Sequence, residues 1–331
     1  MRSFYYTWTH HPADDVFTVV GAEHDEFVLA DGRRVYDFLS TSFQSSFGHS
    51  HPAIRAAIHS QLDSMPIASP RSTFELKQRV SARLCDLLGL AGGKIFYTVS
   101  GAEAVENALK MARQVTGRTV IAARQRSYHG ASLGALSVTG DWRNATHFTL
   151  DDQTVRIPEP ADDPDLHSTA QLVDDRCAAV ILETITGANG VVIPDGGWLS
   201  KLAEHCRQQG VLLILDEVLC GFARTGPPFA MHHYGVKPDL VCMAKGFTGG
   251  YIPFGAVWTG PRIVQYYDQE KMSCGLTNFA HPLGLAAASA VLDLLGDDTF
   301  LQQKATLESE FCRAIEQIGA RSAVSDVRCR G

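Results

Sequence analysis

The pattern of hydrophobic and polar positions divides the chain near residue 50. In the first part, residues 17–20, 26–29 and 34–37 have the pattern of short strands around a turn at Asp31-Gly32, which predicts a small β element. In the rest, short apolar runs alternate with stretches of helical periodicity. The predicted strands are 94–98, 119–122, 178–182, 211–215, 240–243 and 255–258, and the predicted helices are 53–64, 75–88, 102–114, 199–208 and 283–295.

This alternation predicts an α/β domain with a mainly parallel central sheet and flanking helices, because strands that are apolar throughout need cover on both faces. The segment 283–295 is too short to span a membrane and is interrupted by Asp293, so we expect a buried core helix there. Residues 151–174 are rich in Asp and Pro, and we expect them to form an excursion on the surface.

Composition narrows the classes of partner. The formal net charge is -7, and the longest run of basic residues is Arg33-Arg34, so we expect neither nucleic acid nor a membrane surface as a partner but small molecules. The N-terminus lacks the apolar stretch of a secretory signal. The 8 cysteines form no C-x-x-C pair, and no Cys or carboxylate completes a metal site with His49 and His51. We therefore expect a cytoplasmic protein without a metal.

The segment Ser100-Gly101-Ala102 leaves one predicted strand and opens the helix that follows. Small residues let the backbone close on an anion there, and free N–H groups together with the helix dipole favour phosphate. A plain turn capped by Ser100 explains the same residues equally well.

Asp216 ends the apolar run at 211–215, where a buried carboxylate is costly unless it meets a cation. A protonated pyridine nitrogen is one such cation, and a helix cap or a salt bridge to Arg224 is the alternative. The adjacent Glu217 points to the opposite face of the strand, so the two carboxylates cannot share one site.

Lys245 follows the strand at 240–243. Burial makes a lysine lose its proton more readily, and the neutral amine is the nucleophile that Schiff-base chemistry needs; a lysine reaching out to solvent is the alternative. We expect Asp216 and Lys245 at the same edge of the sheet, where ligands of open α/β sheets bind. Tyr128 suits stacking on a flat heteroaromatic ring, or simple packing in the core.

Further motifs follow these segments in order along the chain. The set is Ser100-Gly101-Ala102-Glu103-Ala104-Val105-Glu106, Tyr128-His129-Gly130, Leu215-Asp216-Glu217-Val218, Gly221-Phe222-Ala223-Arg224-Thr225-Gly226, Ala244-Lys245-Gly246, Gly275-Leu276-Thr277 and His281-Pro282. From about Gly21 to the last residue, the chain resembles the class III (ω-amino acid) aminotransferases, which use pyridoxal 5′-phosphate (PLP).

The resemblance implies a fold-type I PLP-dependent homodimer with active sites at the subunit interface. Residues 1–50 would be the N-terminal β segment of the small domain, 51–296 the PLP-binding domain, and 297–331 the start of a C-terminal small domain that is mostly missing. In relatives, the missing part carries an arginine that can grip a substrate carboxylate.

The resemblance also implies roles for single residues. Lys245 would hold PLP as a Schiff base and shuttle a proton, and Asp216 would keep the pyridine nitrogen protonated. Gly101 and Ala102 would bind the phosphate, and Tyr128 would stack on the ring.

Four more residues match family positions around the pocket. Glu183 corresponds to a glutamate close to the cofactor, and Thr277 would reach the phosphate of the neighbouring subunit. Trp8 and Phe43 fall in the N-terminal region that lines the substrate pocket, although packing in the core explains them as well.

Two departures from the family pattern bear on the reaction. Ala188 stands where many relatives have a second glutamate that is used when glutamate or 2-oxoglutarate is a substrate, which favours pyruvate as amino acceptor. Leu219 replaces a glutamine that bonds the ring hydroxyl. The predicted reaction is transfer of an amino group to pyruvate from an ω-amino donor such as β-alanine, taurine or a diamine.

Other functions compete with this one. An aminomutase or a decarboxylating transaminase would begin with the same lysine. A non-catalytic remnant that binds cofactor or a partner subunit is a further alternative. Gly130-Ala131-Ser132-Leu133-Gly134 also matches the G-x-S-x-G pattern of serine hydrolases, but residues 124–127 separate it from the preceding strand.

Overall fold

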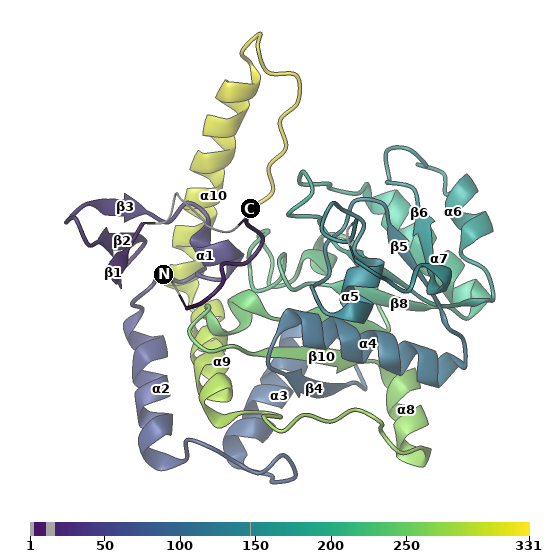
Figure 1. The fold of residues 1–331 in the computed structure, drawn as a ribbon, viewed down its shortest axis with the longest axis horizontal. Coiled ribbons are helices and arrows are strands. Elements are labelled where there is room, and N and C mark those ends of the chain that lie inside the picture. Colours follow the sequence, from purple (N-terminus) through teal and green to yellow (C-terminus); the bar gives the residue numbers. More distant parts are fainter. Residues whose placement is uncertain (1–2, 11–16, 146) are drawn as a thin grey trace.

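The computed structural model describes residues 3–10, 17–145 and 147–331. These residues form a seven-stranded sheet in the order β4-β10-β9-β8-β7-β5-β6 (Figure 1). The strands are β4 (Lys94–Thr98), β5 (Val120–Arg124), β6 (Thr154–Ile157), β7 (Cys177–Glu183), β8 (Leu212–Asp216), β9 (Leu240–Met243) and β10 (Gly255–Thr259). β6, β5, β7, β8 and β9 are parallel, whereas β10 runs antiparallel to β4 and β9. The predicted α/β fold with a mainly parallel sheet is confirmed.

Helices cover both faces of this sheet. One buried cluster joins the sheet to α3 (Glu75–Leu88), α7 (Gly196–Gln209) and α9 (Pro282–Leu295). The other joins it to α4 (Gly101–Thr116), α5 (Leu133–Val138) and α8 (Pro261–Gln269). Within β8, Leu213 and Leu215 belong to the first cluster and Leu212 and Ile214 to the second, because successive strand residues point to opposite faces. Burial on both faces is why β8 is apolar throughout.

The helix α9 is buried along nearly its whole length, as the sequence predicted. It packs against α2 (Pro52–Ser64) and α3, so the segments before and after the sheet strands lie side by side (Figure 1). Among the described residues, no helix combines the length and the apolar character needed to cross a membrane.

The N-terminal part forms a second, antiparallel sheet of β1 (Val19–Glu23), β2 (Glu26–Leu29) and β3 (Arg34–Tyr36). The strand expected at 17–20 begins at Val19 instead and ends later. Of the predicted element 1–50, residues 1–2 and 11–16 lie outside the described residues.

The prediction of a surface excursion at 151–174 is wrong. This stretch contains β6, which pairs with β5 at the edge of the main sheet, and α6 (His167–Leu172). Asp163 is buried and accepts hydrogen bonds from the N and Oγ1 of Thr169, both at 2.8 Å. The indole of Trp198 donates to the Asp163 carbonyl oxygen at 3.0 Å. Donors inside the protein therefore satisfy the carboxylate of Asp163, which was expected to lie on the surface with the rest of this stretch.

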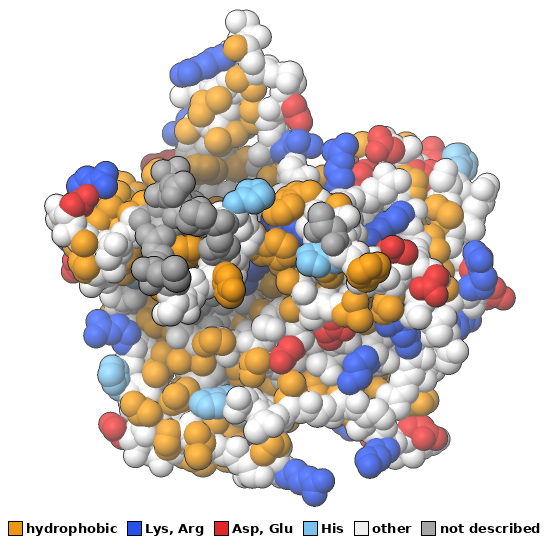
Figure 2. Space-filling view, in the orientation of Figure 1, with side chains coloured by type: hydrophobic (Ala, Val, Ile, Leu, Met, Phe, Trp, Pro, Cys, Tyr) orange, Lys and Arg blue, Asp and Glu red, His pale blue; other side chains and the backbone are white. Residues whose placement is uncertain are grey.

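The helix α10 (Asp298–Gly319) projects from the body of the molecule and has no buried residue (Figure 1). Figure 2 shows hydrophobic side chains on this projection, and Leu307, Phe311 and Ile318 are exposed. The chain then returns toward the body, where the Sγ atoms of Cys312 and Cys329 lie 3.5 Å apart.

Close packing of three strands at Gly255 yields a test of the sheet. A Cβ atom on Gly255 would lie 2.6 Å from Thr98 Oγ1 and 2.7 Å from the Ser100 carbonyl oxygen. We expect Gly255→Ala to lower the free energy of unfolding by about 1–3 kcal/mol, because β4 and β10 must move apart. Urea unfolding followed by circular dichroism measures the change. Gly275→Ala is the control, since no described atom lies within 4 Å of its Cβ position, and an equal loss in both variants would contradict the prediction.

Candidate active site

The carboxyl ends of neighbouring strands converge at one edge of the main sheet. Glu183 ends β7 and is in register with Asp216, which ends β8, and Asp216 is in register with Cys242 of β9. Lys245 follows the end of β9 after one residue, Ala244. Because β10 is antiparallel to both β9 and β4, β4 also points toward this edge and delivers Gly101 there. Ligands of open α/β sheets bind at such an edge.

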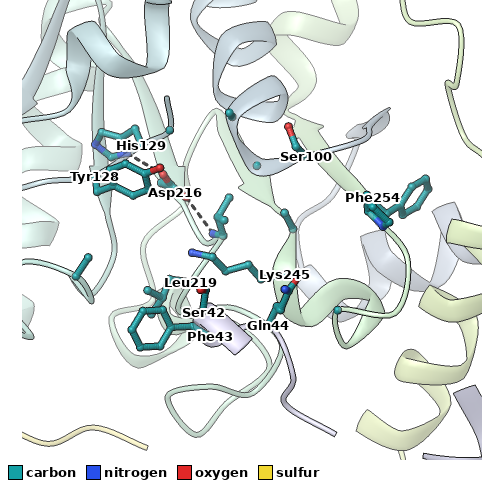
Figure 3. A pocket seen from close by; sticks show the side chains of 18 of the residues that line it. Ser42, Phe43, Gln44, Ser100, Tyr128, His129, Asp216, Leu219, Lys245 and Phe254 are labelled. Carbon is teal, nitrogen blue, oxygen red and sulfur yellow. Dashed lines mark hydrogen bonds and ion pairs between the residues drawn. The ribbon is translucent and has the colours of Figure 1, made fainter. Parts of the chain in front are cut away.

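A cavity of about 780 Å³ opens at this edge (Figure 3). Its lining contains all but one of the predicted site residues, namely Trp8, Phe43, Gly101, Ala102, Tyr128, Glu183, Asp216 and Lys245. Thr277 is the exception, because it is exposed and does not line the cavity. The lining also includes Ala188, Leu219, and residues that were not predicted, among them His129 and Arg143.

Asp216 and His129 form a buried pair on one side of the cavity. His129 Nδ1 lies 2.7 Å from Asp216 Oδ2, and the side chains are 0% and 4% exposed. The Val218 N–H donates to Asp216 Oδ1 at 3.0 Å (Figure 3). Arg224, the alternative partner considered for Asp216, instead donates to the Phe43 carbonyl oxygen and to Ser46 Oγ. The carboxylate therefore has donors on both oxygens and still faces the cavity.

Glu183 is the second buried carboxyl group at this edge. It accepts hydrogen bonds from the N–H groups of Tyr128, at 3.0 Å, and Gly187, at 3.1 Å. Burial raises its pKa, against the opposing effects of His129 and Arg124 and with a further rise from Asp216. Glu183 thus holds the backbone at both Tyr128 and Gly187.

Glu217 points away from the cavity, as predicted from strand geometry. It is fully buried and accepts hydrogen bonds from Thr184 Oγ1 and from the N–H groups of Ala230 and Met231. Burial raises its pKa. Of the adjacent pair, only Asp216 can act in the cavity.

Lys245 enters the cavity from an unusual backbone conformation. Its φ is 49°, in the left-handed region that non-glycine residues rarely adopt. In Figure 3 its side chain points into the cavity, toward the side where Asp216 lies. Burial lowers the pKa of Lys245, although Asp216 and Glu183 pull it upward. Burial therefore shifts the Lys245 amine toward its neutral, nucleophilic form.

The N-terminus of α4 presents free backbone donors to the same cavity. The Ser100 side chain accepts from the Glu103 N–H at 3.1 Å, and Glu103 Oε2 accepts from the Val99 N–H at 3.0 Å. In the described chain, the N–H groups of Gly101 and Ala102 have no acceptor. A Cβ atom on Gly101 would lie 2.8 Å from Val218 Cγ1, so only glycine fits. An anion can bind at these two donors.

A strained turn closes the cavity from the N-terminal side. The residues of α1 (Ser40–Phe43) all have positive φ values, from 47° to 68°, so this segment is a left-handed turn and not an ordinary helix. Arg224 Nη2 holds it through the Phe43 carbonyl oxygen, at 3.3 Å, and Ser46 Oγ, at 2.8 Å. The Phe43 ring centre lies 6.0 Å from Lys245 Nζ.

These groups fit three polar parts of PLP: the phosphate, the ring nitrogen and the aldehyde. The free N–H groups at α4 suit the phosphate, and the buried Asp216 carboxylate suits a protonated ring nitrogen. The Lys245 amine suits the aldehyde carbon, and the Tyr128 ring suits a flat partner. The site therefore fits the cofactor that the sequence resemblance implies.

The serine hydrolase alternative finds no support in the geometry. Ser132 Oγ is buried and has no hydrogen-bond partner among the described residues, so no base activates it. Ser132 instead precedes the short helix α5.

Two residues of the cavity were missed by sequence reasoning. His129 belongs to the Tyr128-His129-Gly130 motif, but its bond to Asp216 joins positions 87 residues apart, which no local pattern reveals. Arg143 follows Trp142 in a loop. An arginine beside an aromatic residue was the available signal, although the same pair is common on protein surfaces.

The comparison with protein families agrees with this site. The family model described as aminotransferase class-III matches residues 10–331. The chain is 35% identical to an acetylornithine aminotransferase of Methanothermobacter thermautotrophicus, over 90% of this chain and 75% of that protein. It is 34% identical to an omega-aminotransferase of Caulobacter vibrioides, over 91% of this chain and 76% of that protein.

Solved structures give the same result. A taurine:2-oxoglutarate aminotransferase from Bifidobacterium kashiwanohense, in complex with PLP and glutamate, superposes with a TM-score of 0.93 at 33% identity, covering 99% of this chain and 78% of that chain. A PLP-bound amine transaminase from an uncultivated Pseudomonas species superposes with a TM-score of 0.92 at 28% identity, covering 100% of this chain and 83% of that chain.

The lowered pKa of Lys245 predicts how its reactivity depends on pH. Only the neutral amine reacts with acetic anhydride, and burial moves its formation below the ordinary lysine value of 10.5. Without cofactor, we expect labelling of Lys245 to reach half its maximum at a lower pH in the folded chain than in the urea-unfolded chain. Mass spectrometry of the labelled peptide measures both curves. Coincident curves, or a higher midpoint in the folded chain, would contradict the prediction.

Proposed function

Because the chain belongs to the class III aminotransferases and these enzymes depend on PLP, we propose that it transfers an amino group from an ω-amino donor to a keto acid, with Lys245 Nζ bound covalently to the cofactor. The observation that carries this proposal is a buried carboxylate, Asp216, and a lysine of lowered pKa, Lys245, at the same end of adjacent parallel strands.

PLP, when bound, supplies an aldehyde that condenses with amines and a ring that accepts electrons from the substrate carbon. We assign to Asp216 the task of keeping a proton on the ring nitrogen. His129 supports this role, because its hydrogen bond to Asp216 Oδ2 orients the carboxylate. The Val218 N–H binds the other oxygen, Oδ1, so the orientation is fixed at both oxygens. The pair is almost fully shielded from water, which strengthens its interaction with a cation.

We assign the proton transfer at the substrate to Lys245. Its Nζ removes the proton from the substrate carbon that bears the amino group, and the lowered pKa of Lys245 supports a role as base. Gly101 and Ala102 bind the phosphate through their free N–H groups. Thr277, which is exposed in the single chain, is assigned to the phosphate of a second subunit in a homodimer.

The residues at the substrate side favour a small acceptor. Ala188 lines the cavity at the position where many relatives of the resembled family have a glutamate, and Leu219 lines it beside Val218. The Ala188 side chain lacks the carboxylate that those relatives use with glutamate or 2-oxoglutarate, and Leu219 offers no polar group to the ring hydroxyl of the cofactor. We therefore propose pyruvate as the acceptor, and β-alanine, taurine or a diamine as the donor.

The first test is an absorbance spectrum of the purified chain with PLP, before and after borohydride reduction. We expect a visible band in the wild-type protein that borohydride fixes onto the peptide containing Lys245, since only an amine in the cavity reaches the aldehyde. Lys245→Ala should lack the band and should form no alanine from β-alanine and pyruvate. Lys237→Ala, which alters an exposed lysine, is the control. A folded wild-type protein without the band would refute the proposal.

The role of Asp216 predicts a contrast between two adjacent carboxyl groups. We expect Asp216→Asn to slow alanine formation by about 10- to 100-fold, because a charge-assisted hydrogen bond to the ring nitrogen is lost. Glu217→Gln is the matched control. It faces away from the cavity, so it should lower the unfolding midpoint in urea while leaving the reaction rate near that of the wild type. Equal loss of rate in both variants would contradict the assignment.

A further inference from the structure

Arg143 is distinctive among the charged residues that line the cavity. The charged members of the lining are Arg143, Glu183, Asp216 and Lys245. Glu183 is bound to backbone donors, Asp216 to His129, and Lys245 is assigned to the cofactor in the proposed function. Within the described lining, Arg143 is therefore the cation that remains for a substrate.

Three aromatic rings surround the guanidinium of Arg143. Its Cζ lies 4.5 Å from the ring centre of Tyr128, 5.0 Å from that of Trp142 and 5.6 Å from that of Trp8. Trp8 and Tyr128 are themselves in an edge contact, with centroids 6.3 Å apart. Rings that contact the face of a guanidinium leave its N–H edge free to bind an anion.

Asp141 uses only part of this edge. It forms an ion pair with Arg143 Nη1 and accepts a hydrogen bond from the Arg143 backbone N–H at 2.8 Å. Nε and Nη2 of Arg143 have no hydrogen-bond partner among the described residues, and they are not buried, so they face the cavity or solvent. A planar guanidinium with two neighbouring free donors matches the two oxygens of a carboxylate or sulfonate.

Packing of the N-terminal segment explains why Arg143 contacts Trp8, but it does not explain why Arg143 also lines the cavity with two N–H donors that are unpaired among the described residues. A purely structural link needs only the ring contacts. The side chain is 19% exposed, so it is partly desolvated and can still reach a ligand. Partial removal of water strengthens an ion pair with a bound anion.

We propose that Arg143 binds the anionic group of the amino donor, so that the donor is an amine carrying a carboxylate or a sulfonate rather than a diamine or an uncharged amine. This inference rests on the proposed function. A diamine would bring a second ammonium group toward the guanidinium, and like charges at close range are unfavourable. Tyr128 links Arg143 to the reacting end of the cavity, because its ring contacts Arg143 and its N–H is bonded to Glu183.

The test compares donors that differ only in charge. β-Alanine and β-alaninamide have the same length, and taurine supplies the sulfonate. The donor half-reaction of the PLP-loaded protein is followed by cofactor absorbance in the wild type, Arg143→Gln and Arg143→Lys. Arg126→Gln removes an exposed arginine from the loop that precedes α5 and is the control for long-range charge.

We expect Arg143→Gln to lower the second-order rate constant for β-alanine or taurine by about 10- to 100-fold, mainly through weaker binding, and that for β-alaninamide by no more than about twofold. Arg143→Lys should recover part of the loss, because it keeps the charge but not the planar edge. A loss confined to one anion identifies the donor as carboxylate or sulfonate. Equal losses for charged and uncharged donors, or no loss for either anion, would overturn the proposal.

A binding measurement separates this inference from the proposed function. Trp8 and Trp142 flank Arg143, so quenching of tryptophan fluorescence by propionate and propionamide reports binding without turnover. We expect the wild type to bind propionate more tightly than propionamide. Arg143→Gln should bind the two ligands with equal affinity. If the wild type shows no half-reaction with any donor, the proposed function is refuted. The comparison of propionate with propionamide still tests whether Arg143 binds an anion. If Arg143→Gln does not fold, the wild type and Arg143→Lys decide, and equal affinity for both ligands would refute the inference.

Discussion

A carboxylate at the end of a buried parallel strand is the constraint on which the site depends. Asp216 is 3% exposed, and its desolvation is tolerated only because His129 and the Val218 N–H bind its two oxygens. Strand register brings Glu183 alongside it, so two acidic groups share one sheet edge. The fully buried Arg124 opposes the charge of Glu183, and a cationic ring nitrogen would do the same for Asp216.

Sequence predicted the strand ends well, because strands buried on both faces are continuous apolar runs and their last residues stand out. That is why the sequence alone predicted Asp216 and Lys245 at one edge of the sheet. The stretch 151–174 could not be predicted, since the burial of Asp163 depends on donors from Thr169, a local bond that composition does not indicate. The helix α10 was not predicted, because it has no buried face that would give a clear apolar stripe.

The parts of the site that sequence missed all depend on contacts between distant segments. Tyr128 was identified by its motif, but its surroundings combine Arg143 from a later loop with Trp8 from the N-terminus. Neither partner has a periodic pattern that points to the cavity. Residues on the sheet edge are fixed by strand geometry, whereas those on the opposite side are fixed by loops, so the cofactor side is more predictable than the substrate side.

Backbone strain occurs on both sides of the cavity, at the sheet edge and at the opposite wall. Lys245 and the α1 turn have positive φ values although none of these residues is glycine, and such conformations cost of order 1–3 kcal/mol each. They persist because other contacts determine them: β9 fixes the start of the Lys245 segment, and Arg224 binds the Phe43 carbonyl oxygen and Ser46 Oγ. Arg224 comes from the segment just after Asp216, so one connection carries the carboxylate and also holds the opposite wall. Backbone strain at both walls of one cavity is the arrangement expected of a site selected for the position of its side chains and not for stability.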